Sequence, residues 1–165
     1  MFSLLAAGLK TFNDYRQSHT QCNLEGTVVK VVDGDSITVL DDEKIQHRVR
    51  LAGIDAPERK QAYGKASTQF LADRVAGKMV CVGWYKRDKY QRLVGVVRIN
   101  NQVMNLALVE AGLAWHYKHY QSEQTESERE DYADAEEDAR AARRGLWSDR
   151  NPTSPWAWRK AKYNR

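Results

Sequence analysis

The sequence predicts an α+β fold, a five-stranded Greek-key β-barrel of the OB type with about three helices. Three observations lead to this prediction. Five short segments with strand-like composition follow one another, one helical segment separates the third from the fourth, and the other helical segments come after the fifth. The chain has 165 residues, which is enough for one domain with a substantial core, and it contains no internal repeat or low-complexity linker.

The first three predicted strands form a meander. Residues 27–32 are β-branched and apolar, the Asp33-Gly34-Asp35 turn follows, and residues 36–40 run back as the second strand of a hairpin. Asp41 and Asp42 begin the next turn, and residues 45–52 alternate as a third strand. Short turns between strands of this kind are typical of a twisted antiparallel sheet.

The rest of the chain supplies two more strands and the helices. Residues 66–76 have helical spacing and end at Gly77, and a second helix ends at Gly112. The aromatic stretch 113–120 fits either a helix or a strand. The predicted elements here are strands at 79–85 and 93–100 and helices at 66–76, 103–111 and 127–144. We therefore expect a lead-in at 1–22, one domain at 23–150, and a basic, tryptophan-containing tail at 151–165.

The charge balance favours a polyanionic partner. The net charge is +4 and the isoelectric point is near 9.1. Lys and Arg concentrate in residues 44–98 and in the tail, whereas residues 123–138 are mostly acidic and are expected to form a solvated helix face. The tail could pack on the barrel or contact nucleic acid, and we favour packing.

Two features bear on the compartment. Cys22 and Cys81 lack metal-site spacing, so they form either one disulfide or two unrelated thiols. Residues 1–9 are apolar but short, with no basic residue before them, which makes a poor signal peptide. They fit the remnant of a signal, a weak membrane anchor or a packed helix. No apolar stretch is long enough to span a bilayer.

The stretch 50–58 carries the strongest chemical signal. It begins as an alternating strand and ends in a Gly/Pro turn that holds Asp55 and Glu58 close to Arg50. A guanidinium group can bind two oxygens of one phosphate in a bidentate manner, and carboxylates hold a hard cation or a proton. The alternative for this stretch alone is a surface cluster of ion pairs.

Two further residues can join this site. Asp35 is either an ordinary turn former or, because the second strand starts where the third ends, a carboxylate that approaches Asp55. Two carboxylates with a backbone carbonyl and water suit Ca²⁺. Glu58 could accept a proton from water, and Arg92 could approach the same phosphate as Arg50. The alternatives are an exposed turn glutamate and a solvated loop cation.

Taken together, these motifs resemble the staphylococcal nuclease family. They are Asp33-Gly34-Asp35-Ser36, then residues 50–58, then Asp88-Lys89-Tyr90-Gln91-Arg92, in this order and at consistent separations. The resemblance runs from about Gly26 to Trp147. It implies an OB-fold barrel that cleaves DNA and RNA with one Ca²⁺ ion and leaves 3′-phosphate ends.

The resemblance also implies roles for individual residues. Asp35, Asp55 and the carbonyl of Ala56 match metal ligands, Arg50 and Arg92 match phosphate-binding arginines, and Glu58 matches the general base. Lys89 and Tyr90 match residues that flank the nucleotide, and Tyr117 and Tyr120 are candidates for stacking on it, although either could belong to the core. Gln91 departs from the pattern, since glycine is common there. In this barrel type the segments of Cys22 and Cys81 are neighbours, which allows a disulfide.

We therefore predict a monomeric, metal-dependent phosphodiesterase that cuts single-stranded or weakly paired nucleic acid fastest. The competing class is a binding module that uses the same barrel to hold nucleic acid or protein without chemistry. The presence of both aspartates, both arginines and Glu58 favours the enzyme. A periplasmic or secreted location is expected, with a membrane-anchored or cytoplasmic one as the alternative.

Overall fold

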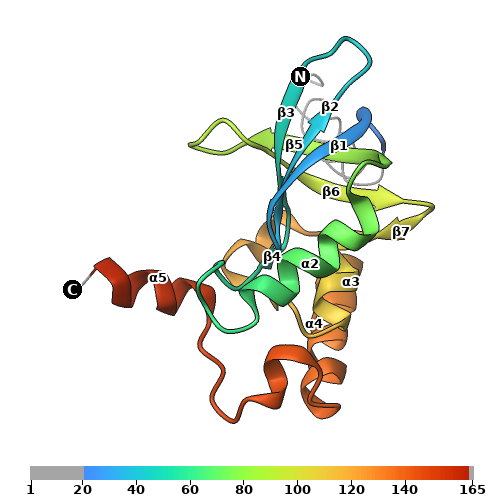
Figure 1. Cartoon of the computed structure of the whole chain (residues 1–165). Coiled ribbons are helices and arrows are strands. Elements are labelled where there is room, and N and C mark those ends of the chain that lie inside the picture. Colours follow the sequence, from blue (N-terminus) through green and yellow to red (C-terminus); the bar gives the residue numbers. More distant parts are fainter. Residues whose placement is uncertain (1–20, 164–165) are drawn as a thin grey trace, which may run out of the picture.

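The computed structural model describes residues 21–163, so most of the predicted lead-in lies outside the described residues. Its centre is a closed five-stranded barrel (Figure 1). The barrel strands are β1 (Leu24–Asp33), β2 (Ser36–Leu40), β3 (Gln46–Leu51), β5 (Met79–Arg87) and β6 (Leu93–Ile99). Antiparallel pairing runs in the order β3-β2-β1-β5-β6, and parallel pairing of β3 with β6 closes the barrel. The predicted α+β barrel is therefore confirmed.

Helices and short strands complete the domain on one side of the barrel (Figure 1). The helices are α2 (Gly64–Val75), α3 (Met104–Glu110), α4 (Glu126–Ala141) and α5 (Pro155–Tyr163), with 3₁₀ segments η1 (Lys118–Glu123) and η2 (Gly145–Ser148). The short strands are β4 (Ile54–Asp55), β7 (Gln102–Val103) and β8 (Trp115–His116). Thr125 and Glu128 form a capping box that fixes the start of α4.

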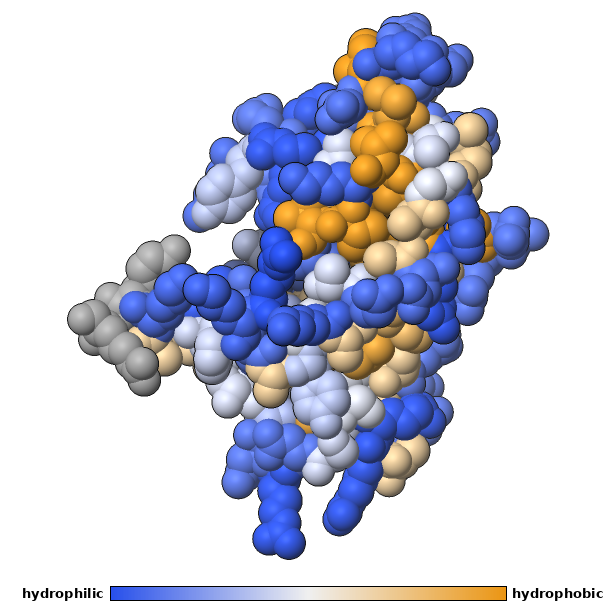
Figure 2. Space-filling view, viewed as in Figure 1, coloured by the Kyte–Doolittle hydropathy of each residue, from blue (hydrophilic) through white to orange (hydrophobic). Residues whose placement is uncertain are grey.

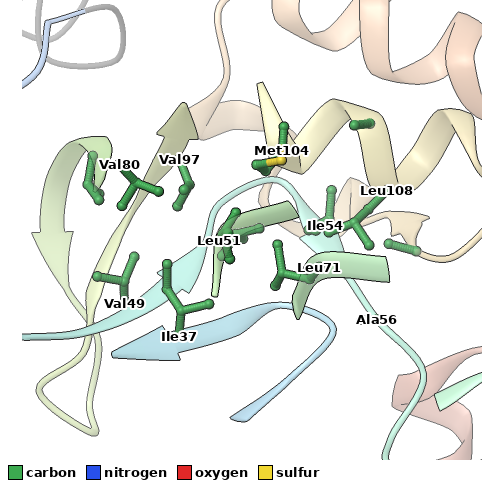
Figure 3. Packing of buried hydrophobic residues seen from close by; sticks show 14 of the residues in the cluster. Ile37, Val49, Leu51, Ile54, Ala56, Leu71, Val80, Val97, Met104 and Leu108 are labelled. Atoms are coloured by element: carbon green, nitrogen blue, oxygen red, sulfur yellow. The ribbon is translucent and has the colours of Figure 1, made fainter. Parts of the chain in front are cut away.

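The core fills the barrel and continues between the barrel and the helices (Figure 3). Val49 and Leu51 point inward from β3, as the alternation of the sequence predicts, and meet Leu71 of α2 and Leu108 of α3. Asn105 is a buried polar exception. Its side chain accepts from the Val97 N–H and donates to two backbone carbonyls, so α3 is hydrogen-bonded directly to the barrel.

The ambiguous stretch 113–120 is neither one helix nor one strand. Its first half forms β8, which pairs with β4 through Ile54↔His116 and Asp55↔Trp115. Its second half begins the 3₁₀ segment η1. His116 is buried, and burial lowers the pKa of its imidazole. The backbone N–H of His116 donates to the buried Glu136 of α4, so the helix holds β8 in place.

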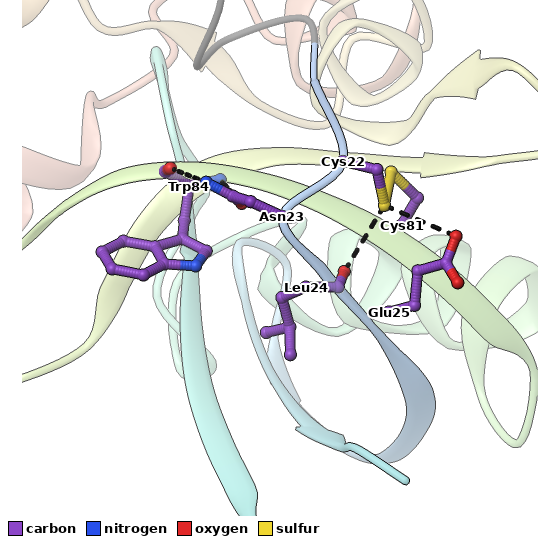
Figure 4. The surroundings of a disulfide bond; sticks show 6 residues. All are labelled: Cys22, Asn23, Leu24, Glu25, Cys81 and Trp84. Atoms are coloured by element: carbon purple, nitrogen blue, oxygen red, sulfur yellow. Dashed lines mark hydrogen bonds between the residues drawn. A yellow bond between two sulfur atoms is a disulfide. The ribbon is translucent and has the colours of Figure 1, made fainter.

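The structure joins Cys22 and Cys81 in a disulfide (Figure 4). Cys22 lies two residues before the start of β1, and Cys81 lies in β5, the strand that pairs with β1. Asn23 continues this pairing with its side chain, which donates to the Trp84 carbonyl at 2.7 Å and accepts from the Trp84 N–H at 2.9 Å. The two strands are therefore tied together at the point where the described chain begins.

On the face shown in Figure 2, apolar residues gather over the barrel, between polar ones. Among the exposed large apolar side chains, Val29, Val32, Ile45 and Met79 belong to the barrel strands or their turns. Within residues 21–163, none of the helices has the length and apolar character needed to cross a membrane.

Candidate active site

Asp35 occupies the tight turn between β1 and β2. A side chain at Gly34 would place its Cβ 1.9 Å from the Ser67 hydroxyl oxygen, so only glycine lets this turn pack closely against α2. Asp35 is buried at 6% exposure, and its carboxylate accepts hydrogen bonds from the Ala56 N–H at 2.7 Å and the Ser36 hydroxyl at 3.1 Å. The turn therefore aims the carboxylate into the molecule, toward the stretch 50–58.

Arg50 joins the two aspartates. The pairing of Ser36 with Arg50 between β2 and β3 places Arg50 beside the turn of Asp35. Its Nη1 lies 3.1 Å from Asp35 Oδ2, and its Nη2 lies 3.2 Å from Asp55 Oδ1. The expected approach of Asp35 to Asp55 is therefore observed, and it takes place through the guanidinium of Arg50.

Asp55 lies at the end of a sharp turn out of the barrel. Gly53 has a φ of +74°, a conformation that favours glycine, and it redirects the chain from β3 into β4. Pairing of β4 with β8 then fixes Asp55, which is 1% exposed. Asp55 is a buried carboxylate on a short, braced strand, which is a rigid place for a functional group.

Glu58 lies at the rim of the site, and its side chain is 40% exposed. Its partner is Arg159 of α5, whose Nη1 lies 2.8 Å from Glu58 Oε1. Arg159 also contacts both oxygens of Asp55, at 3.2 Å and 2.8 Å. Arg159 could not be predicted from the sequence, because one arginine in a basic tail 104 residues after Asp55 carries no local signal. The tail packs on the domain as favoured, but through a helix that reaches this site.

Arg92 comes from the loop between β5 and β6. Its Nε donates to Asp88 at 2.7 Å, and its Nη1 lies 3.3 Å from the Ser36 hydroxyl oxygen, on the side of Asp35. Gln91 adopts a φ of +63°, which explains why the family pattern has glycine there. The loop therefore holds Arg92 toward the site through Asp88 and a strained neighbour.

The charged residues of the site line one cleft of about 710 Å³, namely Asp35, Arg50, Asp55, Glu58, Arg92 and Arg159. The predicted nucleotide-contacting residues Lys89, Tyr90, Tyr117 and Tyr120 line it as well. Tyr90 and Tyr120 are exposed, at 58% and 46%, so neither belongs to the core. Tyr117 stacks on Trp156 of α5, with ring centroids 5.4 Å apart. A larger cavity at Cys22 and the β2–β3 turn contains none of these groups.

The cleft is electrostatically crowded. Burial raises the pKa of the Asp55 carboxyl, and the hydrogen bond with Arg159 opposes this rise. Burial and then the charge of Asp35 raise the pKa of Asp33 to about 6. Burial and then the charge of Asp55 raise the pKa of Tyr117. Burial is the largest cause of each shift, so a buried carboxylate in this cleft is stabilised by a compensating guanidinium or cation.

The site offers a hard cation few protein ligands. Asp35 and Asp55 offer carboxylate oxygens on either side of Arg50, and oxygen donors are the ligands that Ca²⁺ prefers. Across the described range 21–163, no group of three or more His, Cys, Asp or Glu side chains could hold a metal ion. Any cation at the two aspartates would therefore need a backbone carbonyl, water or substrate oxygens to complete its shell.

The chain is similar in sequence to known nucleases. The family model described as staphylococcal nuclease homologue matches residues 48–149. The chain is 42% identical over 141 residues to a protein of Escherichia coli named uncharacterized endonuclease, covering 85% of this chain and 88% of that protein. It is 40% identical over 151 residues to the micrococcal nuclease of Shigella flexneri, covering 86% and 84%. It is also 40% identical over 130 residues to the probable staphylococcal-like nuclease CAN2 of rice, covering 78% and 34%.

Proposed function

The chain belongs to the staphylococcal nuclease homologue family, and on that premise we propose that this nuclease is a Ca²⁺-dependent, sugar-nonspecific endonuclease that hydrolyses DNA and RNA to 3′-phosphate ends. The observation that carries the proposal is the pair of buried aspartates joined by Arg50, in one cleft with Glu58 and Arg92. This arrangement supplies two oxygen donors for a cation, two guanidinium groups for phosphate, and a carboxylate open to water.

The two arginines suit different tasks. The Arg50 side chain is 15% exposed and holds the aspartates at fixed positions, so it pre-organises the carboxylates and adds positive charge beneath a bound phosphate. The Arg92 side chain is 27% exposed and anchored at its Nε, which leaves its Nη groups directed into the cleft. Arg92 can therefore donate to a phosphate oxygen as charge develops on it.

Glu58 suits proton transfer because it is the most accessible carboxylate of the set. A water held by Glu58 and aimed at phosphorus would attack, and one of its protons would pass to Glu58. The bond to the 5′ oxygen would break, and the leaving oxygen would take a proton from solvent water. The products are a 3′-phosphate and a 5′-hydroxyl end. When bound at Asp35 and Asp55, Ca²⁺ would supply charge neutralisation for the phosphate oxygens.

Little sequence preference is expected. The groups around the cleft are phosphate-binding cations and exposed aromatic rings such as Tyr90 and Tyr120, which stack on any base. Stacking needs an unpaired base, so we propose faster cleavage of single-stranded or weakly paired regions by a monomer. The disulfide supports a periplasmic or secreted location, where such bonds persist.

The test is cleavage of single-stranded DNA, duplex DNA and RNA with Ca²⁺, with Mg²⁺ and with EGTA, followed by analysis of the new ends. We expect cleavage with Ca²⁺, loss of cleavage with EGTA, and 3′-phosphate ends. Glu58→Ala should lower turnover about a hundredfold or more, the scale for a lost general base. Glu137→Ala, which removes an exposed carboxylate on α4, is the matched control and should leave turnover unchanged.

Each alternative has a distinct outcome. Cleavage that continues unchanged in EGTA would contradict the cation mechanism, and a near-normal rate for Glu58→Ala would contradict the base assignment. Binding of nucleic acid without cleavage under any of these conditions would instead support the binding module.

A further inference from the structure

Helix α5 brings a second arginine to the buried Asp55. In Figure 1, α5 extends away from the domain toward the C-terminus. Arg159, in the middle of this helix, lines the cleft. Arg159 contacts both carboxylate oxygens of Asp55 and one of Glu58, at distances between 2.8 and 3.2 Å. The helix lies after residue 149, where the match to the family model ends. Nothing in the family pattern therefore assigns Arg159 a role.

The position of Arg159 conflicts with that of a cation. Asp55 has two carboxylate oxygens, and both are held by one guanidinium. A divalent cation at Asp55 needs at least one of these oxygens, and a water beside Glu58 needs the space that Arg159 Nη1 now takes. The guanidinium and the cation neutralise the same buried charge, so they are alternatives at one place.

An aromatic contact on the same helix repeats this pattern. Trp156 stacks on Tyr117, with centroids 5.4 Å apart and an interplanar angle of 19°, and packs edge-on against Trp115 at 5.4 Å. Tyr117 lines the cleft, so the indole covers part of the ring of a cleft residue. One helix thus places a cation on the carboxylates and an aromatic ring on a cleft tyrosine.

The attachment of α5 is open to solvent. The side chain of Arg159 is 38% exposed, and Trp156 is 39% exposed. Pro155, at the start of the helix, is buried and anchors that end. The pair with Glu58 is exposed on both sides and is therefore weak, whereas Asp55 is buried and needs a positive partner. A cation that replaces Arg159 at Asp55 meets this need, so the inner face of α5 can then leave the cleft while the helix stays tethered.

We propose that Arg159 is a built-in competitor of the divalent cation, so that α5 sets the cation concentration at which the nuclease becomes active. The proposal rests on the proposed function, because it assumes that Ca²⁺ binds at Asp35 and Asp55. Cation binding displaces Arg159 from Asp55 and Glu58. Nucleic acid then displaces Trp156 from Tyr117.

The test is direct binding of Ca²⁺ to the full chain by calorimetry, without nucleic acid, for the wild type, Arg159→Gln and Lys160→Gln. Lys160 is exposed on the same helix, so its substitution removes the same charge without touching the carboxylates. Arg159→Gln should bind Ca²⁺ about tenfold more tightly than the other two proteins. A change of this size is typical when one group alters the affinity of a protein for a ligand. Circular dichroism and thermal melting check that all three are folded.

A second measurement uses the wild type alone. Hydrogen exchange of residues 155–163 should become faster when Ca²⁺ is added, because α5 loses its ion pairs with Asp55 and Glu58. Unchanged exchange, or equal Ca²⁺ affinity in Arg159→Gln and Lys160→Gln, would overturn the proposal. Weaker Ca²⁺ binding in Arg159→Gln would also overturn it, by making Arg159 a support of the cation site.

Failure of this proposal can be told apart from failure of the proposed function. If the wild type cleaves nucleic acid only with Ca²⁺ and the two variants bind Ca²⁺ equally, the nuclease mechanism stands and the competition is wrong. If neither the wild type nor Arg159→Gln binds Ca²⁺ at millimolar concentration, the cation site itself is wrong and both proposals fall.

Discussion

Arg50 and Arg159 contact the same carboxylate from two very different parts of the molecule. Arg50 Nη2 lies 3.2 Å from Asp55 and Arg159 Nη2 lies 2.8 Å from it, so distance alone would rank the second contact as stronger. Their anchorage differs. Arg50 belongs to β3, which is paired with β2 and β6, whereas Arg159 belongs to a helix that extends from the domain (Figure 1).

The comparison shows that the supporting element, more than the contact length, indicates what a charged group can do. A side chain on a doubly paired strand keeps its geometry during the reaction, which electrostatic stabilisation requires. A side chain on an exposed arm can be exchanged for another ligand. We therefore treat Arg50 as part of the catalytic machinery and Arg159 as its removable counterpart.

The largest expected effect separates these two arginines. Arg50→Lys keeps the charge but cannot hold Asp35 and Asp55 at once, so kcat/KM at saturating Ca²⁺ should fall about a hundredfold or more. Arg159→Lys should change the same quantity by less than about threefold, because Arg159 has left the site at saturating Ca²⁺. Equal losses of kcat/KM in the two variants, with unchanged melting temperatures, would contradict the different roles of the arginine on β3 and the arginine on α5.

The part of the site that lies on the barrel strands could be predicted from the sequence, because patterns between residues close together in the chain determine it. Val49 and Leu51 alternate with Arg48 and Arg50, which fixes the face of β3, and the Asp33-Gly34-Asp35 turn fixes the start of β2. Two short connections then determine that Asp35 and Arg50 meet. The motifs that resemble the family added the loop of Arg92, which no periodicity would have linked to the turn.

The part of the site that helix α5 contributes could not be predicted, because the contacts of Arg159 join segments about a hundred residues apart. Nothing in the pattern around Arg159 differs from that around Lys160 or Lys162. The secondary structure of the stretch 113–120 could not be assigned from the sequence for a related reason. Its aromatic residues satisfy both periods, and pairing of β8 with β4 together with the hydrogen bond from His116 to Glu136 decides the outcome.

A second prediction concerns what makes the barrel rigid. Replacing Cys22 and Cys81 by serine removes a link that spans 59 residues, and should lower the free energy of unfolding by about 2–4 kcal/mol in urea denaturation. Neither cysteine lines the active-site cleft, so kcat/KM at 25 °C should stay within about twofold. Thiol titration of the unfolded, unreduced wild type is the control and should detect no free thiol. Two titratable thiols would mean that the bridge is absent in solution.

The smallest expected effect tests the cost of ionising Asp33, which is partly buried beside Asp35. Burial and the neighbouring Asp35 raise the pKa of Asp33 from its ordinary 3.8 to about 6. A raised pKa means that the folded state binds this proton more tightly than the unfolded state does, so the contribution is full below about pH 4 and is lost as the pH rises through 6. Asp33→Asn cannot ionise and avoids this loss.

We therefore expect Asp33→Asn to be more stable than the wild type above pH 7, by about 1–2 kcal/mol after allowance for partial solvent exposure. Below pH 4 this advantage should disappear. Denaturation at several pH values measures it, with Asp42→Asn, an exposed carboxylate of the β2–β3 turn, as the matched control. An advantage that is the same at pH 4 and pH 8 would show that packing, rather than charge, produces it. Millimolar Ca²⁺ should reduce the advantage at pH 8, because a cation at Asp35 and Asp55 offsets the charge that repels ionised Asp33.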